Sequence, residues 1–322
     1  MIATTDAPSH PAADRPAGPV AHDGGLGRPP HEPAGDRRRR SGSRAPRRPA
    51  ASLAVNGILL LGVAYMVLPL LWLVFAVTKD AKGLYGSSAF SPGGAFLENL
   101  QQLMTQDDGI FWRWLGNSVF YAGVGALVCG FVALMAGYAF DKFTFRGKNG
   151  LFGFVLVGVL IPNTATVIPL YLLAASIGAT NTIWAVLIPA FCNPFSVYLA
   201  RVFSAGYLPD ETLEAARVDG AGPIRSFLSV GLPMLVPGFV TIVLFQFVAI
   251  WNNFMLPLIM LQDRDLFPSS VGIALWQSQV QQNPEFSTLV IAGSFVSILP
   301  LLLAFIGLQR FWRSGLSAGA VK

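Results

Sequence analysis

Six apolar runs, each long enough to cross a bilayer, constrain this chain more than any other feature. A transmembrane helix needs about 20 consecutive, mainly apolar residues. Runs of this kind lie near residues 53–77, 116–140, 151–173, 183–203, 233–259 and 289–309. Charged residues make up only 12% of the chain, about half the share of a soluble domain. The sequence therefore predicts an all-α, polytopic integral membrane protein with six transmembrane helices, in a membrane domain over residues 51–322.

Residues 1–50 differ in composition from the rest of the chain. They hold most of the excess positive charge, including the run Arg37–Arg40, among Pro, Ala, Gly and Asp residues. A segment with so little aliphatic content cannot offset its ordering entropy, so we expect a disordered basic tail. Nucleic-acid binding is the weaker alternative, because a basic segment beside a membrane span serves as a topology signal.

The distribution of Lys and Arg predicts the orientation, since cytoplasmic loops carry the excess. Besides the tail arginines, one set of loops carries Lys142, Arg146, Lys148, Arg201, Arg217, Arg225, Arg310, Arg313 and Lys322. The opposite set carries Lys79, Lys82, Arg113 and Arg264. We therefore expect both termini and residues 204–232 in the cytoplasm, and residues 78–115 and 260–288 outside.

Residues that carry out catalysis or bind metals are scarce. All three histidines lie in the tail. Cys129 and Cys192 lie within apolar runs, where a thiol usually packs as a small hydrophobe. The Gly147-Lys148 pair lacks the preceding glycine of a phosphate-binding loop. The sequence predicts that the chain is not an enzyme, does not hydrolyse ATP, and binds no metal.

The polar groups within the six runs are neutral. Ion-coupled transporters and pumps usually need ionisable groups at that depth, but the runs hold amides and hydroxyls: Asn163, Thr164, Thr166, Asn193, Gln246, Asn252, Asn253, Ser294 and Ser297. Such groups suit a polar, uncharged substrate, although each could instead join two helices at about 0.6 kcal/mol. We expect a substrate pathway at Gln246 and at Trp251, Asn252, Asn253 and Phe254, where an aromatic face beside paired amides matches a sugar.

Prolines interrupt three of the runs. They lie at positions 162 and 169 in the third run, 189 and 194 in the fourth, and 257 in the fifth. Such breaks are tolerated in a bilayer when neighbouring helices or side chains satisfy the freed carbonyl groups. We expect kinks that serve packing more than any direct role in function.

The polar segment 204–232 has the pattern of a helix, a glycine break and a second helix. Asp210 is the expected N-cap, and Glu211 lies in the first turn, where the helix dipole favours negative charge. Gly220-Ala221-Gly222 predicts the end of this helix, and Pro223 fits the first position of the next.

Two interpretations of segment 204–232 are open from the residues alone. It could lie on the bilayer as an amphipathic hairpin, or it could dock on a cytoplasmic partner and transmit movement to the spans. Phe227 and Leu228 give the second helix an apolar patch, which modestly favours docking.

The same segment resembles the EAA loop of permease subunits in bacterial ABC importers. That pattern is Glu-Ala-Ala, three residues, Gly, nine residues, then Ile-x-Leu-Pro. The matching positions here are Glu214, Ala215, Ala216, Gly220, Leu232 and Pro233. Val230 stands where the pattern has isoleucine. Further similarity to the maltose-type second permease of carbohydrate importers lies at residues 117–118, 136–140, 143–149, 162, 168–171, 181–182, 251–254 and 257–258. The resemblance covers about residues 53–322.

The resemblance implies a MetI-like permease fold in the bacterial cell membrane and a role in importing a sugar or oligosaccharide. It implies three kinds of partner: a cytoplasmic ABC ATPase dimer, a second homologous permease subunit and an extracytoplasmic sugar-binding protein. The ATPase would use ATP and Mg, and this chain would bind no cofactor. The coupling residues would be Glu214, Ala215, Ala216, Asp219, Gly220 and Pro233.

Two other transporter classes are alternatives. One is an ABC permease for a non-sugar solute, such as a peptide, a polyamine or an anion. A charged cargo would be expected to leave complementary charges along the passage, and the apolar runs carry none away from their ends. A secondary transporter predicts internal repeats and ion sites near the bilayer midplane, and neither is visible in the sequence.

Overall fold

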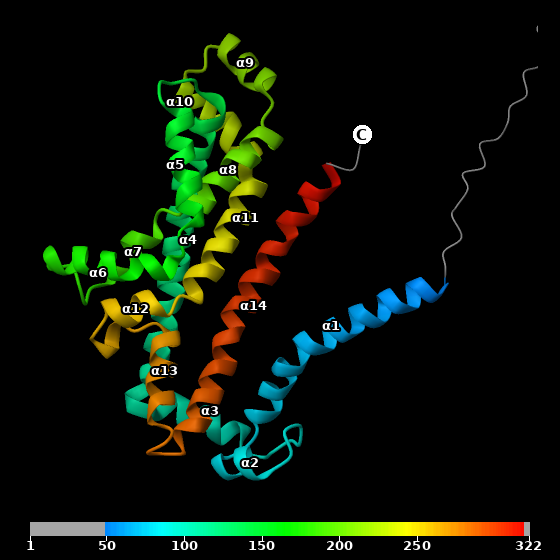
Figure 1. The fold of residues 1–322 in the computed structure, drawn as a ribbon, viewed down its shortest axis with the longest axis vertical. Coiled ribbons are helices and arrows are strands. Elements are labelled where there is room, and N and C mark those ends of the chain that lie inside the picture. The colour runs from blue at the N-terminus through cyan, green and yellow to red at the C-terminus, as the bar shows by residue number, and fades with distance from the viewer. Residues whose placement is uncertain (1–48, 319–322) are drawn as a thin grey trace, which may run out of the picture. The chain divides into compact units, whose positions relative to one another are not determined.

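The structure, a computed structural model, describes residues 49–318 and the side chains of residues 55–308. The tail predicted over residues 1–50 lies outside this part, apart from its last two residues. The described part contains helices and no strands (Figure 1). In chain order they are α1 (Pro49–Ala76), α2 (Ala81–Gly86), α3 (Phe96–Thr105), η1 (Gln106–Gly109), α4 (Ile110–Lys142), α5 (Lys148–Leu160), η2 (Asn163–Thr166), α6 (Val167–Ser176), α7 (Ile183–Ala190), α8 (Pro194–Tyr207), α9 (Asp210–Val218), α10 (Pro223–Ser226), η3 (Phe227–Gly231), α11 (Leu232–Trp251), α12 (Met255–Met260), η4 (Arg264–Leu266), α13 (Ser269–Gln279) and α14 (Phe286–Ala318).

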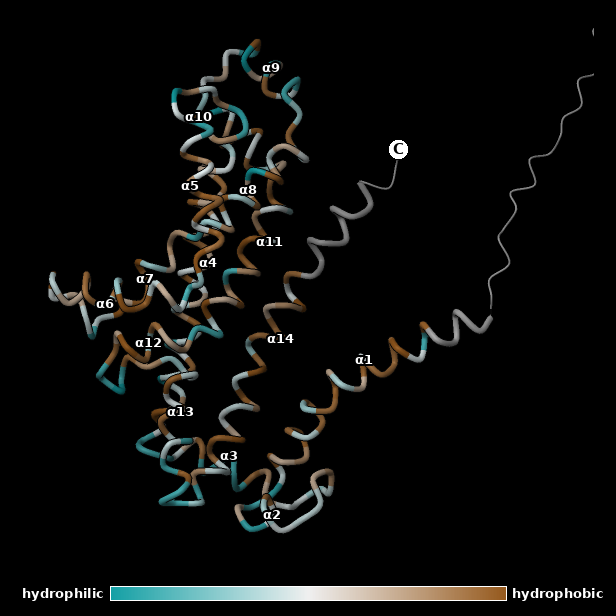
Figure 2. Tube along the Cα trace, viewed as in Figure 1, coloured by the Kyte–Doolittle hydropathy of each residue, from teal (hydrophilic) through white to brown (hydrophobic). Residues whose placement is uncertain are grey.

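Five helical segments of the described chain are long and apolar enough to cross a membrane. They are Val55–Ala76, Phe96–Lys142, Ile183–Tyr207, Pro223–Trp251 and Phe286–Leu308. The predicted third span is instead a pair, Lys148–Leu160 and Asn163–Ser176, bent by 100°. Figure 2 shows hydrophobic residues concentrated along α1, α11 and α14, and polar residues around α9 and α10. The all-α membrane fold is confirmed, with six spans if the bent pair counts as one.

The bend in the predicted third span follows from Pro162. A proline disfavours helical backbone at the residue before it, and Ile161 is extended, with φ −77° and ψ 122°. Helix α5 therefore ends at Leu160, and the chain turns through η2 into α6. Pro169 causes no break, because it lies in the first turn of α6, where its missing N–H needs no partner.

The predicted fifth span breaks before Pro257 rather than at it. Pro257 lies in the first turn of α12, which the residue tolerates, whereas a continuous helix would push its ring against the carbonyl of Asn253. Helix α11 accordingly ends at Trp251. The Asn253 carbonyl accepts a hydrogen bond from the Ser270 hydroxyl at 3.3 Å. Ser270 of α13 thus satisfies the carbonyl group that this break leaves without a helical partner.

Helix α4 is the element against which α8 and α11 pack. Three of its glycines make this approach possible. A Cβ at Gly137 would lie 2.5 Å from the Arg201 nitrogen on α8. A Cβ at Gly130 or Gly125 would lie under 3.0 Å from a side chain of α11, Val243 or Ile250 respectively. Small residues at helix contacts in membranes let the backbones approach closely.

Three apolar clusters follow one another along α4. Near its start, Phe111 and Trp114 pack with Trp276 of α13. Tyr121 belongs to a middle cluster with α7 and α12. Near its end, Tyr138 packs with residues of α8, α9 and α11. The segments at the two ends of α4 are therefore those expected on opposite faces of the membrane.

The close contact at Gly137 can be tested with Gly137→Ala, for which Gly123→Ala in the same helix is the matched control. A Cβ at Gly123 meets nothing within 4 Å, whereas at Gly137 the backbone of α8 would have to shift. Overpacking of this kind costs about 1–3 kcal/mol. We expect Gly137→Ala to lower the melting temperature in detergent and Gly123→Ala to leave it unchanged. Equal melting temperatures would contradict the packing described.

Candidate functional site

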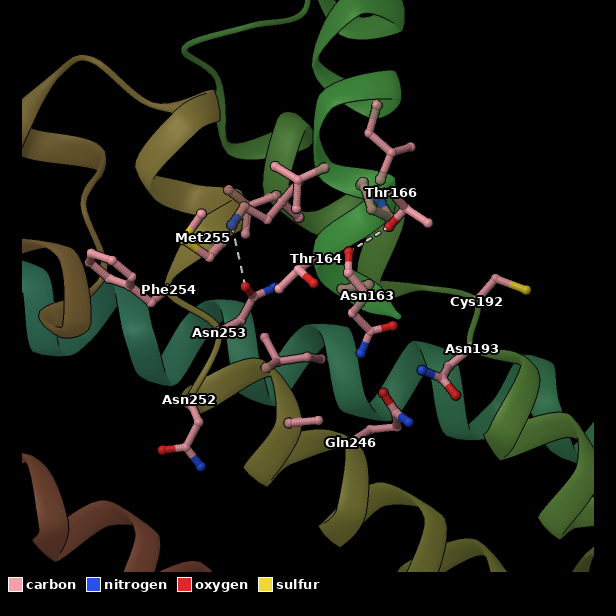
Figure 3. A pocket seen from close by; sticks show the side chains of 18 residues that line it. Asn163, Thr164, Thr166, Cys192, Asn193, Gln246, Asn252, Asn253, Phe254 and Met255 are labelled. Carbon is pink, nitrogen blue, oxygen red and sulfur yellow. Dashed lines mark hydrogen bonds between the residues drawn. The ribbon is translucent and has the colours of Figure 1, made fainter. Parts of the chain in front are cut away.

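A cavity of about 400 Å³ lies among η2, α6, α7, α11 and α12 (Figure 3). It is of the size that small-molecule sites occupy. Of the neutral polar residues predicted within the runs, it gathers Asn163, Thr164, Thr166, Asn193, Gln246, Asn252 and Asn253. Ser294 and Ser297 do not line it. No Asp, Glu, Lys, Arg or His is among its lining residues. The cavity is thus rich in hydrogen-bonding groups and free of formal charge.

Breaks in three spans create this cavity. Its lining includes residues from the break after Pro162, from the break between α7 and α8, and from the break between α11 and α12. Non-helical backbone at membrane depth is tolerated where it lines a cavity or is buried in protein. That these breaks serve mainly as packing kinks stays a prediction, and the breaks also bring polar residues of separate spans together.

The amides of Gln246, Asn193 and Asn163 face one another across the cavity (Figure 3). Gln246 is buried, and its Nε2 donates to the Ser196 hydroxyl at 2.7 Å. The Oδ1 of Asn193 accepts from the Ser196 backbone N–H at 3.2 Å and caps α8. These bonds fix the two side chains while their remaining polar atoms stay available to a ligand.

The predicted cluster 251–254 is divided by the end of α11. Asn252, Asn253 and Phe254 line the cavity, but Trp251 does not. Trp251 is buried and stacks on Phe247, with ring centroids 5.6 Å apart. Trp251 therefore gives this cavity no aromatic face, and its place in a substrate pathway stays a prediction. In Figure 3 the Asn252 side chain also points away from the other labelled amides.

Sequence reasoning missed part of the lining. Cys192 was expected to pack as a small hydrophobe, yet it is exposed and lines the cavity, whereas Cys129 is buried as expected. The signal that could have placed it is Pro194, which marks the start of α8 and leaves Cys192 in the break. Among the described residues, no group of three or more His, Cys, Asp or Glu is placed to hold a metal ion.

The second candidate site is the helix–glycine–helix segment of α9 and α10. Helix α9 starts one residue earlier than predicted, with Pro209 at the N-cap position and Asp210 as the first helical residue. The Asp210 carboxylate instead binds Lys142 at 2.7 Å. That hydrogen bond, and then the Lys142 charge, hold the pKa of Asp210 below its ordinary value. Glu211 lies in the first turn, as predicted.

Gly220 ends α9 as predicted. Its φ is +80°, a left-handed value that favours glycine. The Ala221 N–H donates to the Ala216 carbonyl at 2.9 Å, and the Gly220 N–H donates to the Arg217 carbonyl at 3.0 Å. These two bonds form a Schellman cap, which satisfies the last carbonyls of a helix. Pro223 then starts α10, also as predicted.

Most of the predicted coupling residues are exposed. Glu214, Ala215, Asp219, Gly220 and Pro233 are exposed, whereas Ala216 is buried. The outer face of α9 and its glycine turn are therefore exposed.

The exposed apolar side chains of this segment differ from those predicted. Phe227 is buried against Tyr138, with ring centroids 4.9 Å apart, and only Leu228 of the predicted pair is exposed. Val218 and Ile224, on either side of the glycine turn, are 87% and 77% exposed. They were missed because the sequence does not show which face of each short helix rests on α4.

Residues 129–314 match the family described as the inner membrane component of binding-protein-dependent transport systems. The chain belongs to this family. It is similar to the arabinooligosaccharides transport system permease protein AraQ of Halalkalibacterium halodurans, with 32% identity over 83% of this chain and 97% of that protein. It is also similar to the lactose transport system permease protein LacG of Rhizobium radiobacter, with 28% identity over 86% and 98%.

The fold is similar to that of a solved bacterial ABC transporter involved in the import of the acidic polysaccharide alginate. The TM-score is 0.70 at 20% identity, and the match covers 82% of this chain and 97% of that one. The family and this match confirm the predicted permease fold. The family is one of transporter subunits and not of enzymes.

The different positions of Trp251 and Asn252 can be tested by replacing each with alanine. Trp251→Ala removes a buried ring, which costs about 3–5 kcal/mol. The Asn252 side chain is exposed, and its one hydrogen bond among the described residues goes to the carbonyl of Val248, one turn earlier. Asn252→Ala should therefore change stability little. We expect Trp251→Ala to lower the melting temperature in detergent clearly, and Asn252→Ala to leave it nearly unchanged. A Trp251→Ala protein as stable as wild type would show that the ring is not packed as described.

Proposed function

We propose that this chain is the transmembrane permease subunit of an ATP-driven importer for a sugar or oligosaccharide. It forms half of the translocation pathway and couples to a separate ATPase through residues 204–232. The observation that carries the proposal is that the family pattern from Glu214 to Gly220 forms an exposed, glycine-capped turn. This turn lies at the end of α4 where the Lys- and Arg-rich segments gather.

The cavity supports the sugar assignment. Amides and hydroxyls with no formal charge suit a solute that needs many hydrogen bonds and no counter-ion, and the relatives AraQ and LacG are named for sugars. We assign Gln246, Asn252, Asn253 and Phe254 to the substrate pathway, with Trp251 supporting them from the protein interior. A charged, non-sugar solute is the second candidate, and it is disfavoured because no charged side chain lines the cavity.

The proposal includes three partners. A cytoplasmic ATPase dimer receives the turn of α9 and α10, a second homologous permease completes the pathway, and an extracytoplasmic sugar-binding protein delivers the solute. The ATPase uses ATP and Mg, and this chain binds neither. Both termini and residues 204–232 lie in the cytoplasm, as the Lys and Arg distribution indicates.

In this proposal, the ATPase supplies the free energy and the spans supply two arrangements of the same helices. Closure of the ATPase dimer around ATP displaces α9 and α10. The displacement changes the relative stability of the inward- and outward-facing arrangements, which is a population shift. Because Leu213 of α9 and Phe227 of η3 pack in one cluster with Tyr138 of α4, this movement reaches the spans directly.

Purification from native membranes in mild detergent, followed by uptake measurements in proteoliposomes, tests the function. We expect a nucleotide-binding ATPase and a different six-span permease to co-purify with the chain, and ATP-dependent uptake of a neutral oligosaccharide when the binding protein is added. Uptake of only acidic saccharides would overturn the neutral-solute assignment. Recovery of the chain alone, where other membrane complexes stay intact, would count against the importer itself.

The glycine turn gives a sharper test. In Gly220→Val, a β-branched residue must adopt a φ of +80°, at a cost of roughly 1–2 kcal/mol. Gly222→Val is the matched control, because Gly222 has an ordinary φ of −68° and nothing within 4 Å of its added Cβ. We expect Gly220→Val to lower uptake per ATP hydrolysed at equal expression, and Gly222→Val to retain it. Normal coupled uptake by Gly220→Val would contradict the role of this turn.

A further inference from the structure

The side chain of Lys142, at the C-terminal end of α4, is only 7% exposed. Its Nζ lies 2.7 Å from Asp210 Oδ1 on α9 and 3.1 Å from Asp141 Oδ2 on its own helix. Lysine is almost never buried unless it is paired. The two carboxylates therefore account for its position. One of them, Asp210, belongs to the proposed coupling segment, residues 204–232.

The same network reaches a third helix. Ser204 of α8 is fully buried, and its hydroxyl donates to the Oδ2 atom of Asp141 at 2.8 Å. A chain of contacts from Ser204 through Asp141 and Lys142 to Asp210 thus joins α8, α4 and α9. Lys148 of α5 adds a bond from its ammonium to the Phe143 carbonyl, 2.8 Å away, just past the end of α4.

We propose that Lys142 is a positioning residue that ties the start of α9 to α4 and α8, so that these two helices move with α9 when segment 204–232 is displaced. This inference rests on the proposed function. Leu213 and Ala216 also hold α9 to the bundle by burial, but apolar burial is non-directional and permits sliding. A hydrogen bond between charged groups is directional. The ion pair therefore fixes the position of the first turn of α9.

The asymmetric exposure of this pair indicates which residue is the anchor. The Asp210 side chain is 77% exposed, whereas that of Lys142 is almost fully enclosed. The hydrogen bond and charge of Lys142 lower the pKa of Asp210, so this carboxylate is ionised at neutral pH. When Lys142 is replaced, Asp210 stays in solvent and Asp141 keeps its bond from Ser204. Assembly should therefore survive the change, and the effect should appear in the transmission of movement.

The test uses the purified importer reconstituted in proteoliposomes with its ATPase, partner permease and binding protein. The variants are Lys142→Met, Asp210→Asn and their combination, and the readout is ATP hydrolysed per sugar imported. Arg146→Met is the matched control, because Arg146 is an exposed cation just after α4, outside residues 204–232, and forms no ion pair within the described residues. The amount of ATPase that co-purifies is measured for every variant.

We expect each single variant to raise the ATP-to-sugar ratio at least about fivefold, the lower end of usual coupling effects, with wild-type amounts of ATPase bound. Because both changes remove the same ion pair, the ATP-to-sugar ratio of the double variant should be no higher than that of either single variant. Lys142→Arg, which keeps the charge and a donor, should lower the ratio again towards wild type. Arg146→Met should match wild type.

Several outcomes would overturn the inference. They are a wild-type ratio in both single variants, additive effects in the double variant, the same rise in Arg146→Met, and loss of the ATPase from Lys142→Met. Failure of the proposed function is distinguishable from all of these, because the wild-type complex itself would then show no ATP-driven uptake.

Discussion

Inside a bilayer, every backbone N–H and C=O group must find a partner within the protein, because no water is available to bind it. This constraint governs where the spans of this chain break and what the breaks contain. At Pro257 the carbonyl of Asn253 is freed and takes a bond from Ser270. At the start of α8, the Asn193 side chain satisfies the Ser196 N–H. Each break therefore requires polar side chains at membrane depth, and their gathering forms an uncharged cavity.

The close packing around α4 connects the helices that line this cavity with segment 204–232. Glycines at 125, 130 and 137 allow α8 and α11 to approach α4. The N-terminal half of α4 holds the segment after α12, where Asn117 Nδ2 donates to the carbonyls of Asp265 and Phe267, and Tyr121 donates to that of Leu266. Its C-terminal end holds α9 through Lys142. Helix α4 therefore joins the segment after α12 to α9.

Features encoded by neighbouring residues could be predicted from the sequence. The apolar runs follow from length and hydropathy, the break at Pro162 from the restriction on Ile161, and the end of α9 from the need for a glycine at position 220. The lack of charge in the cavity could also be foreseen, because it is a property of composition.

Features set by contacts between distant residues could not be predicted. Asp210 fits an N-cap by its position in the sequence, but its carboxylate is taken by Lys142, 68 residues away. Pro162 predicts a break in the third span, but the bend angle of 100° depends on the space between neighbouring helices. The burial of Trp251 depends on the same packing. For the same reason Phe227 is buried while Val218 and Ile224 are exposed.

Photo-crosslinking from single cysteines tests most directly the central claim, that the turn between α9 and α10 docks on an ATPase. Cys129 and Cys192 are first replaced with serine. Val218→Cys then places the probe beside the turn, and Tyr85→Cys places it in α2; both native side chains are exposed, at 87% and 71%. The account predicts a crosslink to a nucleotide-binding ATPase in native membranes from position 218 and none from position 85. An absent crosslink at 218, or an equal one at 85, would contradict it.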